Sequence, residues 1–164
     1  MNQGVHTVDL LLWLMGDVER VYAKTLTALH QIEVEDTVVA TLEFRSGAVG
    51  TLEVGTSIYP GYQRRVEVSG SEGTIVLEHD RIIKADLLIA DPTLVTQGAG
   101  DANASASSPI VSDVSGHRRL IEDFLQAIET DSRPICDGRE GRRSVELVEA
   151  IYGSSARSLP VSVS

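Results

Sequence analysis

The residues best suited to chemistry lie in one short stretch at the start of the chain. His6 follows Asn2 by four positions and Asp9 follows His6 by three, and residues at both spacings share one face of a helix. The three side chains can therefore project together from a helix start, where free backbone N–H groups suit an anionic or hydroxyl-rich ligand. In a simpler interpretation, His6 is a hydrogen-bonded residue near a helix end and Asp9 is merely exposed. The spacing alone leaves both interpretations open.

Other patterns that carry catalysis or metal binding are missing from the sequence. None of the remaining histidines has metal-ligand spacing with another histidine or with the single cysteine, Cys136, which we expect to be a small buried residue. There is no G-x-S-x-G motif, and residues 98–103 only approximate G-x-G-x-x-G, without a strand and a helix to flank them. We predict no metal site and no cofactor site within this chain.

The composition indicates a globular, acidic protein of the cytoplasm. A length of 164 residues suits one domain with a single core, which we predict over 1–164. The formal net charge of −10 would repel phosphate backbones, so we expect no nucleic-acid partner. A single cysteine excludes an internal disulfide and fits a reducing compartment. The longest apolar run, residues 10–15, is too short to cross a bilayer, so we expect no membrane partner.

Three helices are predicted from apolar residues that recur at helical spacing. The first runs from Gly4 to Met15, the second covers residues 116–130 with Ser115 able to cap it, and the last covers residues 140–157. The residues expected to face inward on the second helix are Leu120, Ile121, Phe124, Leu125 and Ile128, and those on the last helix are Val145, Val148, Ile151 and Tyr152.

Alternation of apolar and polar side chains predicts about six strands in a mostly antiparallel sheet. The clearest part is a hairpin over residues 36–57. A three-residue loop, residues 45–47, would pair Leu42 with Gly50 and gather the apolar side chains on one face, with Gly47 supplying a positive φ. The other expected strands cover residues 18–27, 65–69, 74–78 and 82–89, with a short one within 159–163.

This order of elements indicates an α+β fold with helices on one face of the sheet. The other face would carry Val39, Thr41, Thr51 and Glu53, a mixture that can be solvated or can pair with a second copy. Residues at about 91–113 are rich in Ala, Ser, Gly and Asp, and we predict a flexible surface loop there.

Several stretches resemble signatures of the Gfo/Idh/MocA oxidoreductase family, in order and at fitting intervals over nearly the whole chain. They are NQGVHTVDLLLWLMG (2–16), IEVEDT (32–37), YPG (59–61), VSGSEGT (68–74), DFLQAI (123–128), DGREGRR (137–143) and EL (146–147). Members of this family have a nucleotide-binding Rossmann domain followed by an α+β domain, and the resemblance covers only the second. It implies a fold like the C-terminal domain of glyceraldehyde-3-phosphate dehydrogenase, without a Rossmann domain.

The resemblance also implies roles for single residues. In the family, a hydride passes between a sugar or polyol carbon and the nicotinamide, and a lysine of the Rossmann domain and a histidine of this helix handle the hydroxyl proton. His6 takes that catalytic position. Asn2 stands where many relatives have Asp, so it can hydrogen-bond a substrate hydroxyl but cannot take a proton; Asp9 would bind substrate or orient His6. The residues implied to line the sugar site from the sheet side are Tyr59, Tyr62 and Arg64. For the two tyrosines, ordinary loop packing is an equal alternative.

The resulting hypothesis is a substrate-binding and dimerisation domain of an NAD(P)-dependent sugar or polyol dehydrogenase. NAD or NADP is implied for the full-length enzyme, and we expect neither to bind this chain alone, which should be inactive. The alternative is a free-standing binding or assembly module that works with a separate nucleotide-binding chain. A third hypothesis, a hydrolase or isomerase using His6 and Asp9, lacks an evident nucleophile or metal set. We predict a homodimer or larger assembly through the open sheet face.

Overall fold

The chain divides into two compact units, which are described separately. The computed structural model describes residues 4–78, 81–91, 94 and 114–163. Unit 1 comprises Met1–Ser57 and Val111–Ser164, and unit 2 comprises Ile58–Ile110. Within the described residues, the strands form a four-stranded sheet in unit 1 and a three-stranded sheet in unit 2. The prediction of one domain over 1–164 stays a prediction.

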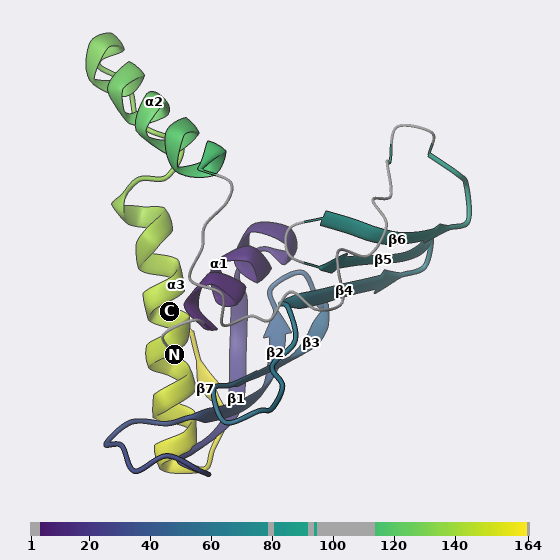
Figure 1. Ribbon diagram of the computed structural model, residues 1–164, viewed down its shortest axis with the longest axis vertical. Helices are drawn as coiled ribbons and strands as arrows, with labels where there is room; N and C mark the ends of the chain where they lie inside the picture. Colours follow the sequence, from purple (N-terminus) through teal and green to yellow (C-terminus); the bar gives the residue numbers. More distant parts are fainter. Residues whose placement is uncertain (1–3, 79–80, 92–93, 95–113, 164) are drawn as a thin grey trace. The chain divides into compact units, whose positions relative to one another are not determined.

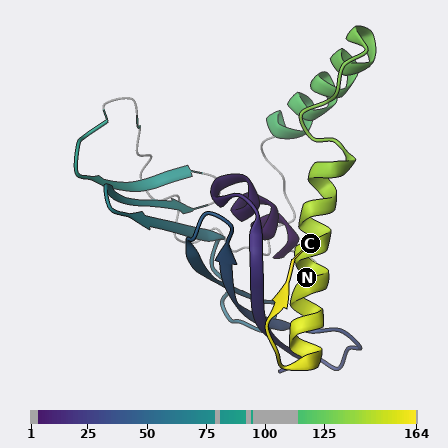
Figure 2. The ribbon, with the colours of Figure 1, turned by 180° about the vertical axis from the view of Figure 1, so that it is seen from behind.

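Unit 1 is a layer of helices on a sheet whose strands lie in the order β3-β2-β1-β7. Its elements are α1 (Gly4–Met15), β1 (Val18–Leu26), β2 (Thr37–Phe44), β3 (Val49–Gly55), α2 (Ser115–Thr130), α3 (Gly138–Arg157) and β7 (Val161–Ser162). All neighbouring strands are antiparallel. Figures 1 and 2 show α3 lying along β1, with the short strand β7 beside it.

Helix α1 has the predicted bounds, and apolar residues at helical spacing turn toward the core. Val8 and Leu12, four residues apart, are both buried in the core of unit 1. The helix ends because Gly16 adopts a φ of +82°, and its N–H bonds the Leu12 carbonyl at 3.0 Å. A positive φ at this position is easy for glycine and strained for other residues, so the sequence itself stops the helix here.

The hairpin of β2 and β3 confirms the predicted register. Leu42 pairs with Gly50 and Val38 with Val54. The Phe44 N–H bonds the Ala48 carbonyl at 2.9 Å across the loop, and Gly47 has a φ of +86°. Alternate residues of β2 are therefore buried under the helices, while the others point to the open side of the sheet.

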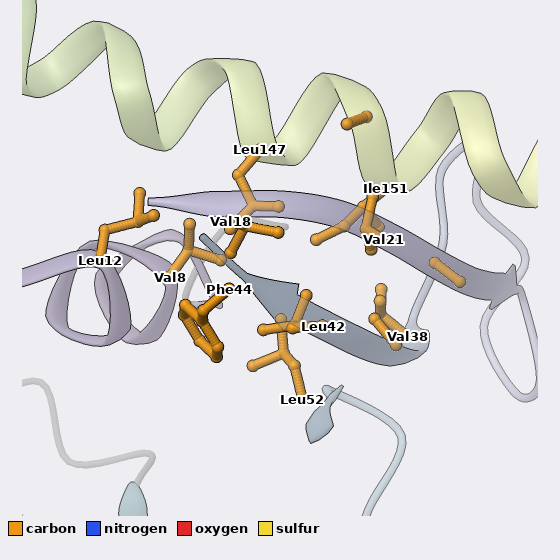
Figure 3. Close-up of a cluster of buried hydrophobic side chains, with 13 residues drawn as sticks. Val8, Leu12, Val18, Val21, Val38, Leu42, Phe44, Leu52, Leu147 and Ile151 are labelled. Atoms are coloured by element: carbon orange, nitrogen blue, oxygen red, sulfur yellow. The ribbon is translucent and has the colours of Figure 1, made fainter. Parts of the chain in front are cut away.

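The core of unit 1 lies between the sheet and the helices α1 and α3. Figure 3 shows Leu147 and Ile151 of α3 above Val18 and Val21 of β1. The predicted inward set of α3 was right for Ile151, which is buried, and for Val148, which packs partly buried against the core. It was wrong for Val145, which is 53% exposed, and for Tyr152, which is 39% exposed. The buried stripe instead contains Ser144, Leu147, Ala150, Ile151 and Ser154. Val145 and Tyr152 fit helical spacing too, but they lie to one side of the face that meets the sheet.

Helix α2 has the predicted extent, but its apolar stripe is uncovered in this chain. Its five predicted inward residues are between 52% and 63% exposed, and Ala127 is its buried residue. The helix begins at Ser115, so this residue lies inside the first turn; the N-cap is Val114, which makes no side-chain capping bond. The expected cap at Ser115 was therefore wrong. By contrast, the Asp137 side chain caps α3 through the N–H groups of Arg139 and Glu140.

Unit 2 is a meander of three antiparallel strands. It contains β4 (Arg65–Gly70), β5 (Gly73–Glu78) and β6 (Arg81–Leu87), in that order across the sheet. Gly70 pairs with Gly73 across a two-residue turn. Gly73 has a φ of +153°, and a Cβ there would lie 2.4 Å from the Asp86 carbonyl oxygen, so the close approach of β6 requires glycine.

The α+β class and the antiparallel pairing are confirmed, while the described strands are divided between two sheets instead of one sheet of about six. The division follows the chain, because the irregular segment that includes Tyr59 and Tyr62 separates β3 from β4. Most of the loop predicted at about 91–113 lies outside the described residues. No helix in the described part of the chain is long and apolar enough to cross a membrane.

Candidate functional site

The candidate catalytic histidine lies near the start of α1 and is exposed. His6 is the third residue of the helix, and Asp9 follows on an exposed part of the same helix. Val8 and Leu12 anchor one face of the helix in the core. His6 therefore belongs to a helix that is packed in place, although its own side chain is exposed. Asn2, which the sequence placed with these two residues, lies outside the described residues.

Asp9 is engaged by the neighbouring helix. The Ser144 hydroxyl of α3 donates a 2.9 Å hydrogen bond to Oδ1 of Asp9, and Ser144 itself is only 5% exposed. A hydroxyl on the packed face of a helix needs such a partner, because burying it without one costs free energy. The contact therefore joins α1 to α3 on the turn that follows His6.

Arg143, the residue before Ser144, makes a second connection between the same helices. Its Nη2 donates to the Leu12 carbonyl at 3.3 Å and its Nε donates to Asp17 Oδ1 at 2.8 Å. Its Nη1 donates to Glu140 Oε2 at 2.6 Å. The hydrogen bond to Glu140, followed by that to Asp17, raises the pKa of the guanidinium, which stays charged. The C-terminal end of α1 is thereby bound to α3.

The other predicted substrate-binding residues belong to unit 2. Tyr59, Tyr62 and Arg64 lie in the irregular segment before β4, where the Tyr59–Pro60 peptide bond is cis. Tyr59 is 95% and Tyr62 is 80% exposed, so both residues are accessible to solvent. Since His6 and these residues lie in different units, their meeting in one sugar site stays a prediction.

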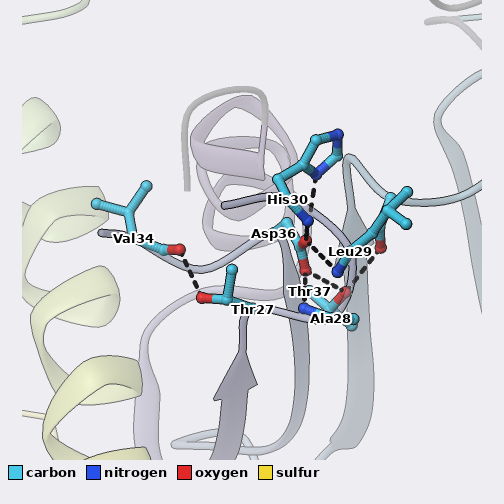
Figure 4. A network of polar contacts seen from close by, with 8 residues as sticks. Thr27, Ala28, Leu29, His30, Val34, Asp36 and Thr37 are labelled. Carbon is cyan, nitrogen blue, oxygen red and sulfur yellow. Dashed lines mark hydrogen bonds and ion pairs between the residues drawn. The ribbon is translucent and has the colours of Figure 1, made fainter. Parts of the chain in front are cut away.

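A compact polar cluster surrounds Asp36, immediately before β2. Its carboxylate is buried and accepts hydrogen bonds from the N–H groups of Ala28, Leu29 and His30 at 2.7–2.9 Å. Figure 4 shows these bonds together with those from Thr37 and the His30 ring. The backbone N–H groups hold the pKa of Asp36 well below its usual range, and the N–H of Ala28 has the largest effect. The cluster fixes the chain between β1 and β2.

Two clefts of unit 1 lie away from His6. One, of about 520 Å³, is lined by Thr25, Leu26, Thr27, Glu33, Val34, Glu35 and Tyr152. The other, of about 120 Å³, is lined by Leu12, Asp17, Val18, Arg45, Arg143, Glu146 and Val163. Neither contains a residue that the sequence assigned to catalysis or to substrate.

The described residues contain neither the turn that usually holds a nicotinamide dinucleotide nor a group of metal ligands. A nicotinamide dinucleotide is usually held by a Gly-rich turn between a parallel strand and a helix, and every strand pair described here is antiparallel. The near-match at residues 98–103 lies outside the described residues. No group of three or more His, Cys, Asp or Glu side chains in the described part of the chain could hold a metal ion. Cys136 is exposed, so the expectation that it is buried was wrong.

Sequence reasoning missed the two residues that tie α1 to α3. A signal for Ser144 was present, because Ser144, Leu147, Ile151 and Ser154 recur at intervals of three and four along α3. A serine in such a stripe is a polar residue in a packed face and should have a partner there. For Arg143, the partners include a backbone carbonyl, and no spacing in the sequence identifies such a contact.

A family model and a solved structure of an oxidoreductase both match this chain. The family model of the GFO/IDH/MocA C-terminal domain matches residues 1–76. The solved structure of the WlbA dehydrogenase from Bordetella pertussis, in complex with NADH and UDP-GlcNAcA, has a TM-score of 0.82 and 32% identity. That match covers 100% of this chain and 46% of the other.

Two curated relatives match over nearly the whole chain. The uncharacterized oxidoreductase YrbE of Bacillus subtilis is 27% identical, with 99% of this chain and 47% of that protein covered. The D-apiose dehydrogenase of Paraburkholderia graminis is also 27% identical, with 93% and 41% covered. The chain thus spans about half the length of the curated relatives that it matches.

Proposed function

The chain belongs to the Gfo/Idh/MocA oxidoreductase family as a C-terminal domain, and from this premise we propose that it is the substrate-binding domain of an NAD(P)-dependent sugar or polyol dehydrogenase. The observation that carries the proposal is the exposed imidazole of His6 near the start of α1, on a helix that the core and α3 hold in place. An exposed imidazole can exchange a proton with a substrate hydroxyl near neutral pH.

The names of the relatives support a substrate rich in hydroxyl groups. The Bordetella pertussis WlbA dehydrogenase was solved with UDP-GlcNAcA, and other relatives are a D-apiose dehydrogenase and a myo-inositol 2-dehydrogenase. We assign the hydroxyl-proton transfer to His6, with Asn2, Tyr59, Tyr62 and Arg64 as substrate contacts. The nucleotide would be held by another part of the full-length enzyme, so this chain alone should not transfer hydride. We place the enzyme in the cytoplasm, where its single cysteine would stay reduced.

The test is to fuse this chain behind the part of the Bordetella pertussis WlbA dehydrogenase that it does not cover. Formation of NADH is then followed with UDP-GlcNAcA, D-apiose and myo-inositol, for the fusion and for the chain alone. In the active fusion, His6→Ala should lower kcat by about 10²- to 10⁴-fold, the usual contribution of a general acid–base group. The matched control is His117→Ala, which removes an exposed histidine of α2.

The outcomes separate the parts of the proposal. An equal loss of kcat in His6→Ala and His117→Ala would contradict the catalytic role of His6. Turnover by the chain alone would contradict the proposal that it is inactive without a nucleotide-binding domain. A fusion that turns over none of the three compounds would count against the proposed substrate class.

We also propose that the open side of the unit 1 sheet pairs with a second copy. Tyr22 and Val39 are each 49% exposed on this face. Val39 pairs with Lys24 on one side and with Glu53 on the other, so positive and negative side chains flank an apolar centre. A two-fold axis that passes this centre parallel to the strands would set Lys24 of each copy against Glu53 of the other, which favours self-association.

Light scattering after size exclusion tests this pairing. The wild-type chain should have the mass of a dimer at micromolar concentration, and Val39→Glu should reduce it to a monomer by placing a charge at the centre of the face. The control Val145→Glu puts the same charge on an exposed position of α3 and should leave the dimer intact. A monomeric wild-type chain would refute the pairing.

A further inference from the structure

The orientation of α1 is set by directional contacts as well as by apolar packing. Val8 and Leu12 bury the helix, but apolar contacts are non-directional and tolerate small rotations about the helix axis. Hydrogen bonds have preferred distances and angles, so a few of them can select one rotation. In unit 1 these bonds come from two consecutive residues of α3, Arg143 and Ser144.

The two contacts meet α1 at different positions along its axis. Ser144 bonds the Asp9 side chain in the middle of the helix, and Arg143 bonds the Leu12 carbonyl near its end. His6 lies three residues before Asp9 and on the same side of the helix. A rotation of α1 that broke the bond between Asp9 and Ser144 would therefore turn the His6 ring as well.

We propose that Asp9 and Ser144 are positioning residues, which fix the rotation of α1 and so the direction in which His6 is presented to substrate. The inference rests on the proposed catalytic role of His6. Of the two tasks that the sequence left open for Asp9, it selects the orientation of His6 over a substrate contact, because Oδ1 of Asp9 is already engaged by α3. Asp9 acts on the reaction through His6.

The chain contains a matched comparison on the same helix. Near the other end of α3, the Ser155 hydroxyl accepts the N–H of Thr25 at 2.8 Å and contacts the Thr25 hydroxyl at 3.0 Å. That serine joins α3 to β1 and leaves α1 untouched. Ser155→Ala therefore removes a partly buried hydroxyl contact of α3 without loosening the helix that carries His6.

The test measures the order of α1 and of the His6 ring by NMR relaxation and residual dipolar couplings on the full chain. Ser144→Ala and Asp9→Ala should each increase the motion of the His6 ring and change the dipolar couplings of α1. Because they break the same bond, their effects should not add in the double variant. Asp9→Asn keeps an acceptor oxygen and should restore the order, while Ser155→Ala should leave α1 as in the wild type.

The fusion enzyme gives a second readout. Ser144→Ala should lower kcat by about ten- to a hundredfold with little change in KM, the pattern of a misplaced catalytic group. An unchanged His6 ring in both alanine variants would overturn the proposal. A higher KM for Asp9→Asn with an ordered α1 would also overturn it, because Asp9 would then contact substrate. If His6→Ala has no effect on turnover, the proposed function fails, while the NMR measurements still decide whether the helix is held by this pair.

Discussion

The phenol hydroxyl of Tyr152 on α3 donates a 2.9 Å hydrogen bond to Oε1 of Glu35, just before β2. Partial burial, together with the hydrogen bond to Glu35 and the charge of Glu35, raises the pKa of Tyr152 to about 12. The phenol thus keeps its proton in the folded chain at pH values where a tyrosine of the unfolded chain has lost it. The surroundings of Tyr152 should therefore make the fold less stable at alkaline pH.

The free energy of unfolding should fall as pH rises above the ordinary tyrosine value of 10.0 toward the folded value of about 12. The sign follows because the folded chain binds this proton more tightly than the unfolded chain does. Tyr152→Phe should remove that part of the decline, as measured by urea unfolding at a series of alkaline pH values. Tyr59→Phe, at a ring that is 95% exposed, is the control. Parallel pH curves for wild type and Tyr152→Phe would contradict the prediction.

Asp36 should make the fold sensitive to acid. Its pKa is held below the ordinary value of 3.8, so its contribution to stability is present above that value and is lost as pH falls below it. Asp36→Asn replaces an acceptor oxygen by a donor among backbone N–H groups. It should lower Tm at neutral pH by roughly 5–10 °C and flatten the acid part of the curve. Thermal unfolding from neutral to acid pH checks both effects, and Glu19→Gln, an exposed position, is the control. A Tm unchanged at neutral pH would show that the hydrogen bonds to Asp36 do not stabilise the fold.

The buried face of α3 can be tested with two neighbouring apolar residues. Leu147 is fully buried and Val145 is 53% exposed. Leu147→Ala should lower the free energy of unfolding by about 2–5 kcal/mol, because it removes buried methyl groups and leaves a cavity. Val145→Ala should change it by less than about 1 kcal/mol. Chemical denaturation of both variants measures the difference, and similar losses would mean that the helix is rotated from the orientation described here.

Unit 2 should depend on one of its two turn glycines. A Cβ at Gly73 would lie 2.4 Å from the Asp86 carbonyl oxygen, whereas a Cβ at Gly70 would meet nothing within 4 Å. Gly73→Ala should therefore destabilise the unit by more than about 1 kcal/mol and speed amide exchange in β5 and β6. Gly70→Ala should have a much smaller effect. Equal protection of these amides in the two variants would contradict the close approach of β6.

The sequence predicted those features that depend on local rules. The register of Leu42 with Gly50 followed from alternation and from the glycine of the turn, and the bounds of α1 followed from its apolar spacing and Gly16. Where two faces had similar spacing, the prediction failed, as at Val145. Spacing shows that a helix is amphipathic, but the element packed against it decides which residues are buried.

The candidate site shows the same limit. His6 could be selected by its position, since a helix start and a family signature both indicate it. The surroundings of Asp9 could not be predicted in this way, because its partner Ser144 lies 135 residues further along the chain. The partners of Asp36 could not either, since three of them are backbone N–H groups, which every residue other than proline supplies.

Helix α2 behaves differently from α1 and α3 because Ala127 is its buried residue. A helix with so little buried surface gains little from the cooperative core and depends mainly on its own local bonds. In the isolated chain it should therefore open and close many times during the life of one folded molecule. Among the described helices, its backbone should therefore exchange deuterium and be cleaved by a protease first, long before the layer formed by α3 and the sheet unfolds.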